Sequence, residues 1–244
     1  MSLNRNCLNN IDAVILAGGL GTRVSHILKD KPKVLAPVGG RPFLDILLER
    51  LAGFGARRVV LGLGHLAEAV NAHLKESSPE GMEVITATEP APLGTAGAVR
   101  FLMNRIKSDP VLVMNGDSFV GADLCAFVAS HAASGAEASL LCAEVDDTSR
   151  FGRIDIDPDG RVKSFAEKTG APSPGIISAG VYLFNAAMLS RIRMSSGPSL
   201  ERDIFQAMET RSLHAMTGRF PFIDIGAPES LDAASDVVLS CLNG

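Results

Sequence analysis

The 244-residue chain has no tryptophan, a single tyrosine and only 5% aromatic residues. Basic residues are not in excess either, because 23 Lys and Arg stand against 27 Asp and Glu, a formal net charge of −4. A protein that binds nucleic acid broadly presents a basic surface, which this composition does not provide. We therefore expect no nucleic-acid partner, and any anionic ligand must be held by a few local cations.

Long apolar runs are also missing. No segment approaches the roughly 20 apolar residues that span a bilayer, and residues 1–12 lack the apolar stretch of a signal peptide. We expect a cytoplasmic protein with no membrane partner. The cysteines form no C-x-x-C pair, so we expect reduced packing residues, with a disulfide left open. They are Cys7, Cys125, Cys142 and Cys241.

Signatures of several enzyme classes are absent. The histidines form no H-E-x-x-H pair, which argues against a zinc hydrolase, and no G-x-S-x-G nucleophile elbow occurs. Asp155, Asp157 and Asp159 alternate like part of a calcium loop, but the twelve-residue pattern and its terminal glutamate are missing. We interpret these aspartates as turn and strand surface.

Hydrophobic residues make up 46% of the chain and charged residues 20%, which predicts a packed globular core. In the first half, short apolar runs alternate with amphipathic segments, a pattern typical of βαβ units on a parallel sheet. Strands are predicted at Ala13–Ala17, Val59–Leu63, Glu83–Ala87 and Val111–Asn115, and helices at Pro42–Phe54, His65–Lys75, Thr95–Ile106 and Asp123–Ala133.

The second half has a different pattern. Gly152–Asp157 and Arg161–Ala166 flank a Pro-Asp-Gly turn and predict a hairpin. The remaining predicted elements are a strand at Ala179–Phe184, a helix at Leu200–Thr210, a last core strand at Phe220–Ile225 and a closing helix at Pro228–Leu239. The alternation fades near Glu144, which indicates an inserted sub-structure or a longer edge of the sheet. We expect a single α/β domain: a Rossmann-like, mixed but mainly parallel sheet flanked by helices, with a β-rich insertion.

The segment after the first strand is rich in glycine. Gly18–Arg23 reads G-G-x-G-T-R, and Pro32–Pro42 reads P-K-x-L-x-P-V-x-x-R-P. Glycines at the carboxyl end of a parallel strand let backbone N–H groups approach a nucleotide closely. Val24 stands where a dinucleotide-binding loop needs a small residue, and no P-loop motif occurs. Dehydrogenase and P-loop functions are therefore excluded.

This long pattern resembles the signature of the sugar-1-phosphate nucleotidyltransferases, or nucleoside-diphosphate-sugar pyrophosphorylases. Later segments agree with the family in order, from about Asp12 to the final helix. They are Glu89-Pro90, Leu93–Ala98, Asn115-Gly116-Asp117, Phe151-Gly152, Glu167-Lys168, Ser178–Tyr182 and Asp224-Ile225-Gly226. Among the members, the chain looks most like the D-glycero-D-manno-heptose 1-phosphate guanylyltransferases.

The resemblance implies a nucleotide site made of Leu16, Ala17, Gly18, Gly19, Gly21, Thr22, Glu89, Gly94, Thr95 and Ala96. It also implies that Arg23 and Lys33 are catalytic, because loop cations can neutralise a triphosphate and the leaving pyrophosphate. The alternatives are ordinary solvated charges for Arg23, Lys33 and Glu89, and a helix N-cap for Thr95.

Two aspartates lie at or just beyond the ends of predicted strands. Asp117 comes after Val111–Asn115, and Asp224 lies near the end of Phe220–Ile225. Carboxylates delivered to one edge of the sheet suit Mg²⁺, which takes few protein carboxylates together with waters and substrate phosphates. The resemblance assigns Mg²⁺ to both residues, and helix N-capping is the alternative.

On the sugar side, the resemblance implies contacts from Asn115, Phe151, Gly152, Glu167, Lys168 and Ser178. Lys168 could instead form a surface ion pair with its neighbour. Ser178 stands where many relatives have asparagine, which puts direct sugar recognition there in doubt.

The resemblance implies a Mg²⁺-dependent transfer of a nucleotidyl group from a nucleoside triphosphate to a sugar 1-phosphate, with GTP and D-glycero-D-manno-heptose 1-phosphate as the expected substrates. The alternatives within the family are a mannose-1-phosphate guanylyltransferase and an amino-sugar or glucose 1-phosphate uridylyltransferase. The alternative from another functional class is a non-catalytic regulatory subunit that binds a sugar nucleotide. A glycosyltransferase is disfavoured because Asn115-Gly116-Asp117 lacks the first aspartate of Asp-x-Asp.

Residues 1–244 are expected to form one single-activity domain, and the resemblance divides it into a nucleotide-binding half at about 12–144, a sugar-binding half at about 145–227 and a closing helix at 228–244. The sequence leaves open whether the protein forms a homo-oligomer.

Overall fold

The computed structural model describes residues 6–19, 21, 23–28, 31–166, 170–208 and 212–242. Its strands are β1 (Ala13–Ala17), β2 (Pro37–Val38), β3 (Arg41–Pro42), β4 (Arg58–Leu63), β5 (Glu83–Thr88), β6 (Val111–Asn115), β7 (Ser118–Val120), β8 (Ala138–Val145), β9 (Arg153–Ile156), β10 (Val162–Ala166), β11 (Gly175–Phe184), β12 (Leu213–Gly218) and β13 (Phe222–Asp224). The helices are α1 (Ser25–Leu28), α2 (Phe43–Gly53), α3 (Ala67–Glu76), α4 (Gly94–Leu102), α5 (Leu124–Ser134), α6 (Ala186–Met194) and α7 (Pro228–Leu242). Short helical turns are η1 (Lys33–Leu35), η2 (Met103–Arg105), η3 (Leu200–Ile204) and η4 (Phe205–Ala207).

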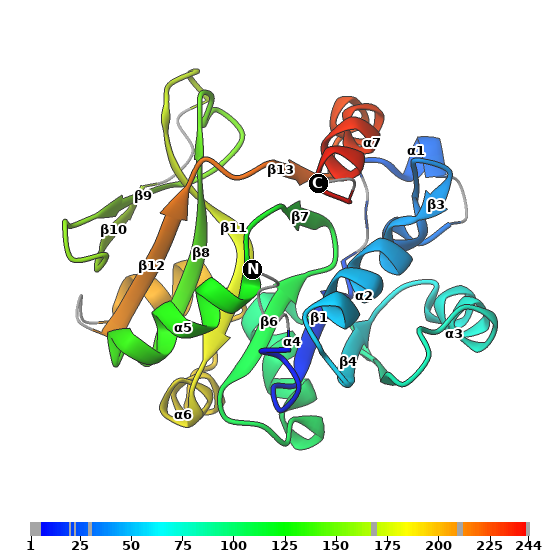
Figure 1. The fold of residues 1–244 in the computed structure, drawn as a ribbon, viewed down its shortest axis with the longest axis horizontal. Coiled ribbons are helices and arrows are strands. Elements are labelled where there is room, and N and C mark those ends of the chain that lie inside the picture. The colour runs from blue at the N-terminus through cyan, green and yellow to red at the C-terminus, as the bar shows by residue number, and fades with distance from the viewer. Residues whose placement is uncertain are drawn as a thin grey trace.

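A nine-stranded mixed sheet forms the centre of the molecule (Figure 1). Strands β6, β1, β4 and β5 are neighbours in that order and run parallel, so their carboxyl ends share one edge. Strand β11 runs antiparallel beside β6, and β8 and β12 continue the sheet beyond it. This arrangement confirms the predicted mixed, mainly parallel α/β fold.

Two apolar clusters cover the two faces of the sheet. Successive strand residues point to opposite faces, so Ile15 of β1 joins one cluster and Val14 joins the other. Helix α2 buries one side against the first cluster, and Leu47 and Leu48 on that side are fully buried. Phe205 of η4 packs in the second cluster. Helices therefore pack against both faces of the sheet.

The first half of the chain follows the predicted pattern closely. All four predicted strands occur, as β1, β4, β5 and β6, with ends that differ by at most one residue. The four predicted helices also occur, as α2, α3, α4 followed by η2, and α5. The hairpin β9–β10, the strand β11 and the closing helix α7 confirm three predictions for the second half.

Two predicted elements are wrong in type. Phe220–Ile225 is not a core strand, because its central residues form β13, which pairs with β7 in a separate two-stranded sheet. The predicted helix Leu200–Thr210 is an irregular π-type turn followed by a 3₁₀ turn, as far as the structure describes it. The Leu200 backbone N–H donates to Thr95 Oγ1 and the Ser199 N–H donates to Asp203 Oδ2, and these hydrogen bonds hold the coil in this form.

The sequence did not predict β7, β8, β12 or α6. Strand β8 lies between β11 and β12, and its first six residues are buried, so it shows no alternation. The hairpin β9–β10 joins the main sheet through the pairing of Arg153 with Ile177. The expected inserted sub-structure is therefore also an extension of the sheet.

The prediction of four reduced cysteines is wrong for one pair. Cys7 and Cys125 form a disulfide across 118 residues of sequence, with Cα atoms 5.4 Å apart. The packing of the N-terminal segment beside α5 brings the two cysteines together, and no local sequence motif could predict this. Cys142 and Cys241 are free. None of the helices in the described ranges is long and apolar enough to cross a membrane.

Candidate active site

The loops that follow β1, β5 and β6 open onto the same edge of the sheet. Figure 1 shows β6 and β1 beside each other in the middle of the molecule, with β7, β13 and α7 above them. Two pockets lie at this edge and share Asn115, the last residue of β6. Ligands of open α/β sheets bind at the carboxyl ends of the strands, so this edge is the natural place for a site.

The first pocket has a volume of about 280 Å³. It is lined by Leu16, Ala17, Gly18, Gly19, Lys33, Val34, Glu89, Pro92, Leu93, Gly94, Thr95, Ala98, Asn115, Gly116 and Asp117. Gly18 follows β1 and passes close to Glu89, since a Cβ on Gly18 would lie 2.6 Å from Oε1 of that carboxylate. The glycine therefore lets the strand end and the carboxylate approach each other.

Glu89 is an almost buried carboxylate, with 8% of its surface exposed. Its Oε2 accepts a hydrogen bond from the Leu93 backbone N–H at 3.3 Å, and Oε1 has no donor among the described residues. Burial raises the pKa of Glu89, and the Leu93 hydrogen bond opposes this only in part. A buried acceptor without a partner is costly, so Glu89 is suited to receive donors from a ligand.

Thr95 does not cap its helix. The N-cap of α4 is Leu93, and Thr95 Oγ1 accepts a hydrogen bond from the Leu200 backbone N–H at 2.9 Å. The Ala96 backbone N–H donates to the Pro198 carbonyl at 2.9 Å, beside the same contact. The N-terminus of α4, which walls the first pocket, is thus tied to η3.

Two carboxylates and two cations converge beside the first pocket. Lys33 Nζ lies 2.6 Å from Asp117 Oδ2, and the Ile225 backbone N–H donates to the Asp117 carbonyl at 2.9 Å. The charged side chains lie close together around the backbone of Gly226. A Cβ there would lie 2.5 Å from Asp224 Oδ1, 3.0 Å from Lys33 Nζ and 3.1 Å from Arg23 Nη2.

The surroundings of Asp224 disfavour the charged form of its carboxyl group. Burial raises the pKa of Asp224, and the negative charge of Asp117 raises it further, while Lys33 opposes the shift. Asp123, not Asp117, caps α5, with its side chain accepting from the Cys125 and Ala126 N–H groups. Asp117 is therefore not a helix cap, and Asp224 Oδ1 accepts a hydrogen bond from the Gly226 backbone N–H at 2.6 Å, ahead of α7. The two carboxylates lie close enough for the charge of one to act on the other.

The donor set fits a magnesium ion. Mg²⁺ in phosphate-transfer sites takes one or two carboxylates and fills its other positions with water and substrate phosphate. Asp117 and Asp224 supply such a pair, and their mutual repulsion is what a cation would relieve. In the part of the chain that is described, no group of three or more His, Cys, Asp or Glu side chains forms a metal cage.

The second pocket, of about 250 Å³, lies on the other side of these carboxylates. It is lined by Arg23, Asn115, Ser118, Arg150, Phe151, Gly152, Ser178, Gly180, Glu201, Phe222 and Asp224. Phe151 meets Phe222 edge to face, with ring centroids 5.6 Å apart. Gly180 has a φ of +71°, and a Cβ there would lie 2.6 Å from Asn115 Nδ2, so only glycine fits this bulge of β11.

The sequence missed several of these residues, notably Arg150 and Glu201. Arg150 donates to Ser230 Oγ at 2.6 Å, and its guanidinium lies 5.7 Å from the Phe151 ring centroid. Its position directly before the Phe-Gly pair was a usable signal. No local pattern marks Glu201, which arrives on η3 from a distant part of the chain.

Most predicted site residues line one of the two pockets. Gly21 and Ala96 lie outside both linings, although each is next to the loop or helix that forms a wall. Ser178 lines the second pocket and accepts a hydrogen bond from the Gly180 N–H. Thr22, Glu167 and Lys168 lie outside the described residues.

The Nucleotidyl transferase family model matches residues 12–240, so the chain belongs to this family of nucleotidyltransferases. The chain is 35% identical, over 82% of its length, to mannose-1-phosphate guanylyltransferase from Mycobacterium tuberculosis and spans 56% of that protein. It spans 66% of the mannose-1-phosphate guanylyltransferase catalytic subunit beta from Drosophila pseudoobscura pseudoobscura, at 33% identity over 99% of the chain.

A second group of relatives matches over nearly its whole length. The D-glycero-alpha-D-manno-heptose 1-phosphate guanylyltransferase from Campylobacter jejuni is 31% identical over 90% of this chain and 96% of its own. The crystal structure of HddC from Yersinia pseudotuberculosis superposes with a TM-score of 0.82 and 34% identity, covering 93% of this chain and 98% of HddC. HddC has also been crystallised in complex with GMP-PN.

Proposed function

We propose that the protein transfers a guanylyl group from GTP to a sugar 1-phosphate and releases pyrophosphate. The observation that carries this proposal is the position of Lys33, Asp117, Asp224 and Arg23 between two pockets that share Asn115. The first pocket would hold the nucleotide and the second the sugar. Two anionic substrates would then meet at the cluster with their phosphates facing each other.

The reaction needs no covalent intermediate with the protein and no general base. An oxygen of the sugar 1-phosphate, already anionic at neutral pH, forms a bond to the α-phosphorus of GTP. The bond from the α-phosphorus to the bridging oxygen breaks, and its electron pair leaves with pyrophosphate. Arg23 and Lys33 hold and neutralise the triphosphate, so catalysis consists of positioning and charge stabilisation.

We propose Mg²⁺ as the cofactor, held by Asp117 and Asp224. When bound, it would supply positive charge to phosphate oxygens of both substrates. The role of the protein is to place the two carboxylates at the ends of β6 and β13, where the pairing of Asp224 with Ser118 fixes their separation. Lys33 stays beside Asp117 and limits the net negative charge of the pair.

Glu89 supports guanine as the base. The Watson–Crick edge of guanine presents two adjacent donors, N1–H and the N2 amino group, which a carboxylate can accept together. Uracil and thymine present one donor between two carbonyl oxygens, which a carboxylate repels. Glu89 lines the first pocket with an unused buried oxygen, so this pocket favours guanine over pyrimidines.

For the sugar, we favour D-glycero-D-manno-heptose 1-phosphate, with mannose 1-phosphate as the second candidate. Both sugars occur in the names of relatives at 31% to 35% identity. A non-catalytic subunit is disfavoured because a protein that only binds does not need the converging pair of cations and pair of carboxylates.

A matrix of substrates tests the proposal. The purified protein is assayed for pyrophosphate release with each of the common nucleoside triphosphates against heptose, mannose, glucose and N-acetylhexosamine 1-phosphates, with Mg²⁺ present. We expect release with GTP and a manno-configured sugar 1-phosphate. Release with UTP or dTTP but not GTP would overturn the base assignment. No release with any pair would overturn the proposed function.

A further inference from the structure

A third pocket, of about 190 Å³, adjoins the second. The two share Gly152, Ser178 and Glu201 as a common wall, and the third pocket extends past them to Arg153, Arg202 and Gln206. Neither the carboxylate Asp224 nor Arg23 lines it. The third pocket therefore continues the second one on the side away from the phosphate cluster.

The position of the third pocket determines which end of a bound sugar 1-phosphate could enter it. Its phosphate must lie near Arg23 and Asp224, so the opposite end of the sugar points toward the common wall of Gly152, Ser178 and Glu201. At about 250 Å³, the second pocket is smaller than the usual ligand site of roughly 300–1,000 Å³. A substrate longer than a hexose phosphate would extend into the third pocket.

Glu201 stands at the boundary with its carboxylate held in place. The Tyr182 hydroxyl donates to Glu201 Oε1 at 3.2 Å, and the Ser178 hydroxyl donates to the Tyr182 oxygen at 3.2 Å. Among the described residues, no donor contacts Glu201 Oε2. The carboxylate is thus oriented by the protein on one oxygen and open to the pockets on the other.

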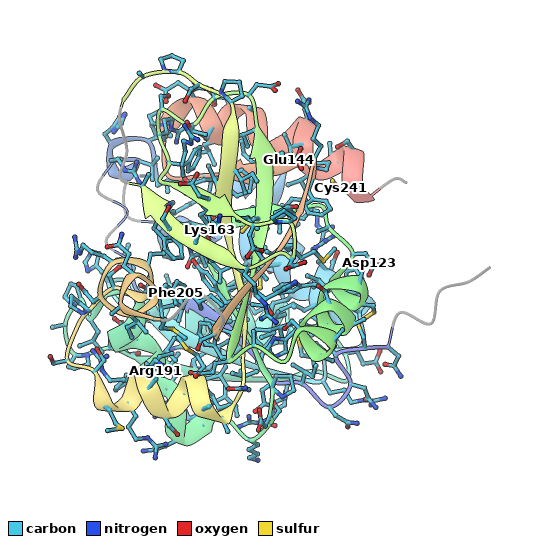
Figure 2. All side chains as sticks on the ribbon, turned by 90° about the vertical axis from the view of Figure 1, so that its left-hand side faces the viewer. Asp123, Glu144, Lys163, Arg191, Phe205 and Cys241 are labelled. Atoms are coloured by element: carbon cyan, nitrogen blue, oxygen red, sulfur yellow. A yellow bond between two sulfur atoms is a disulfide. The ribbon has the colours of Figure 1, made fainter. Side chains whose placement is uncertain are left out.

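Tyr182 is buried among aromatic rings, which fix the position of its hydroxyl group beside Glu201. It is the single tyrosine of the chain and is 3% exposed. Its ring packs at centroid distances of 5.8 Å from Phe184 and 5.6 Å from Phe205. Figure 2 shows Phe205 in the coil that lies beside the β9–β10 hairpin, where Lys163 is labelled. Burial and the nearby charge of Glu201 raise the pKa of Tyr182, which keeps its hydroxyl protonated as a donor.

The arginines of the third pocket each have a carboxylate neighbour outside its lining. Arg153 lies 3.9 Å from a carboxylate oxygen of Asp155, and Arg202 lies 3.5 Å from one of Asp203. Both arginines are therefore already near carboxylates. Glu201 adds a carboxylate acceptor, which can take hydrogen bonds from hydroxyl groups of a ligand.

We propose that the third pocket receives a hydroxylated carbon chain carried by the sugar opposite its 1-phosphate, and that Glu201, oriented by Tyr182, accepts hydrogen bonds from its hydroxyl groups. This inference rests on the proposed function and deepens it. A manno-heptose carries one more hydroxylated carbon outside the ring than mannose does. Glu201 is thereby a specificity-determining residue and Tyr182 a positioning residue.

The test compares two sugars in matched variants. With GTP as the common donor, kcat/KM is measured for D-glycero-D-manno-heptose 1-phosphate and for mannose 1-phosphate. The wild type should prefer the heptose by about tenfold or more, as expected for a site that pairs an extra hydroxyl. Glu201→Gln and Tyr182→Phe should each lower this preference by about three- to tenfold, because the loss falls mainly on the heptose.

Glu144→Gln is the control, since it removes an exposed carboxylate on β8 that lines none of the three pockets. Figure 2 shows Glu144 well away from the coil around Phe205. Thermal melting of each variant reports folding, and calorimetric titration with both sugar phosphates reads the preference without turnover. Retained preference in both folded pocket variants, or equal use of the two sugars by the wild type, would overturn the inference. Absence of turnover with every pair would contradict the proposed function instead, while calorimetry still decides the third pocket.

Discussion

At the scale of single residues, the site is built from polar groups that the fold brings together without fully satisfying. Glu89 keeps one buried oxygen without a donor among the described residues, and Glu201 keeps one oxygen open to the pockets. Asp224 carries a raised pKa because burial and Asp117 both disfavour its charge. Such groups cost stability unless a ligand pairs with them, which is the usual condition of a binding site.

Glu89→Gln should weaken GTP recognition. The amide places a donor where guanine also presents donors, so we expect kcat/KM for GTP to fall by about tenfold or more. Steady-state kinetics with GTP and ITP, which lacks the guanine amino group, would check this, because the variant should lose most of its discrimination between them. Glu68→Gln on the exposed side of α3 is the matched control. Unchanged discrimination would show that Glu89 does not read the base.

The pH dependence of GTP use follows from the same residue. Burial raises the pKa of Glu89, so its protonation begins at a higher pH than that of an ordinary glutamate. Only the carboxylate accepts from guanine, so kcat/KM for GTP should fall as the pH falls through the raised pKa. Glu89→Gln should lose this part of the profile. Identical profiles for wild type and variant between neutral and mildly acidic pH would contradict the assignment.

Residues that follow a strand or a spelled pattern could be predicted from the sequence. Asp117 follows the apolar run of β6, and Lys33 belongs to the long proline-rich motif. Glu201 and Arg150 could not be predicted in the same way. Glu201 reaches the pocket only because η3 docks against α4 and β11, and the role of Arg150 depends on contacts with Ser230 and Phe151.

At the scale of secondary-structure elements, the wall of the first pocket and the coil of the second are one connected unit. The start of α4 holds η3 through the contact of Thr95 with the Leu200 N–H and of the Ala96 N–H with Pro198. η3 carries Glu201 into the second and third pockets. Disturbance at α4 should therefore reach the sugar side.

Thr95→Val tests this connection. Valine has nearly the same shape but leaves the Leu200 N–H without its acceptor, which should cost about 1–3 kcal/mol of unfolding free energy. The looser coil should raise the KM for the sugar 1-phosphate several-fold. Chemical denaturation and steady-state kinetics measure the two effects. Thr217→Val on the exposed side of β12 is the control. A variant with normal stability and a normal KM would show that the contact is unimportant.

The sequence predicted the parallel strands well because each is a short apolar run followed by a glycine or polar turn. It failed at β8, whose buried run shows no alternation, and at β13, which is only three residues long and pairs outside the main sheet. The pattern of Leu200–Thr210 suits a helix, but the described part is a π-type turn followed by a 3₁₀ turn, and the Leu200 N–H donates to the distant Thr95 Oγ1. These failures share one cause, which is that distant contacts decide the local structure.

At the scale of the whole molecule, strands of the main sheet contribute residues to both pockets, and the disulfide between Cys7 and Cys125 ties the N-terminal segment to α5. A cross-link that closes such a long loop restricts the unfolded chain, and native disulfides typically contribute about 2–4 kcal/mol. Disulfides are rare in reducing compartments, so the Cys7–Cys125 bond argues against the predicted cytoplasmic location.

Reduction of the disulfide should lower stability without removing the fold. We expect the unfolding free energy to fall by about 2–4 kcal/mol in reductant and in Cys7→Ser, while Cys241→Ser should have little effect. Denaturant titration measures this. Thiol titration of the unfolded, unreduced protein should find only Cys142 and Cys241. Reaction of all four cysteines, with no effect of reductant on stability, would show that the bond does not form.

In the function that we propose, Lys33 and Asp117, which line the first pocket beside the second, carry the transfer of the guanylyl group. The most direct measurement is single-turnover formation of the GDP-sugar from GTP and the preferred sugar 1-phosphate, in wild type, Lys33→Ala and Asp117→Asn. Lys75→Ala, an exposed lysine on α3, is the control. We expect a loss of at least about 100-fold in both site variants with unchanged melting curves, and no loss in the control. Rates near that of the wild type in folded Lys33→Ala and Asp117→Asn would contradict it.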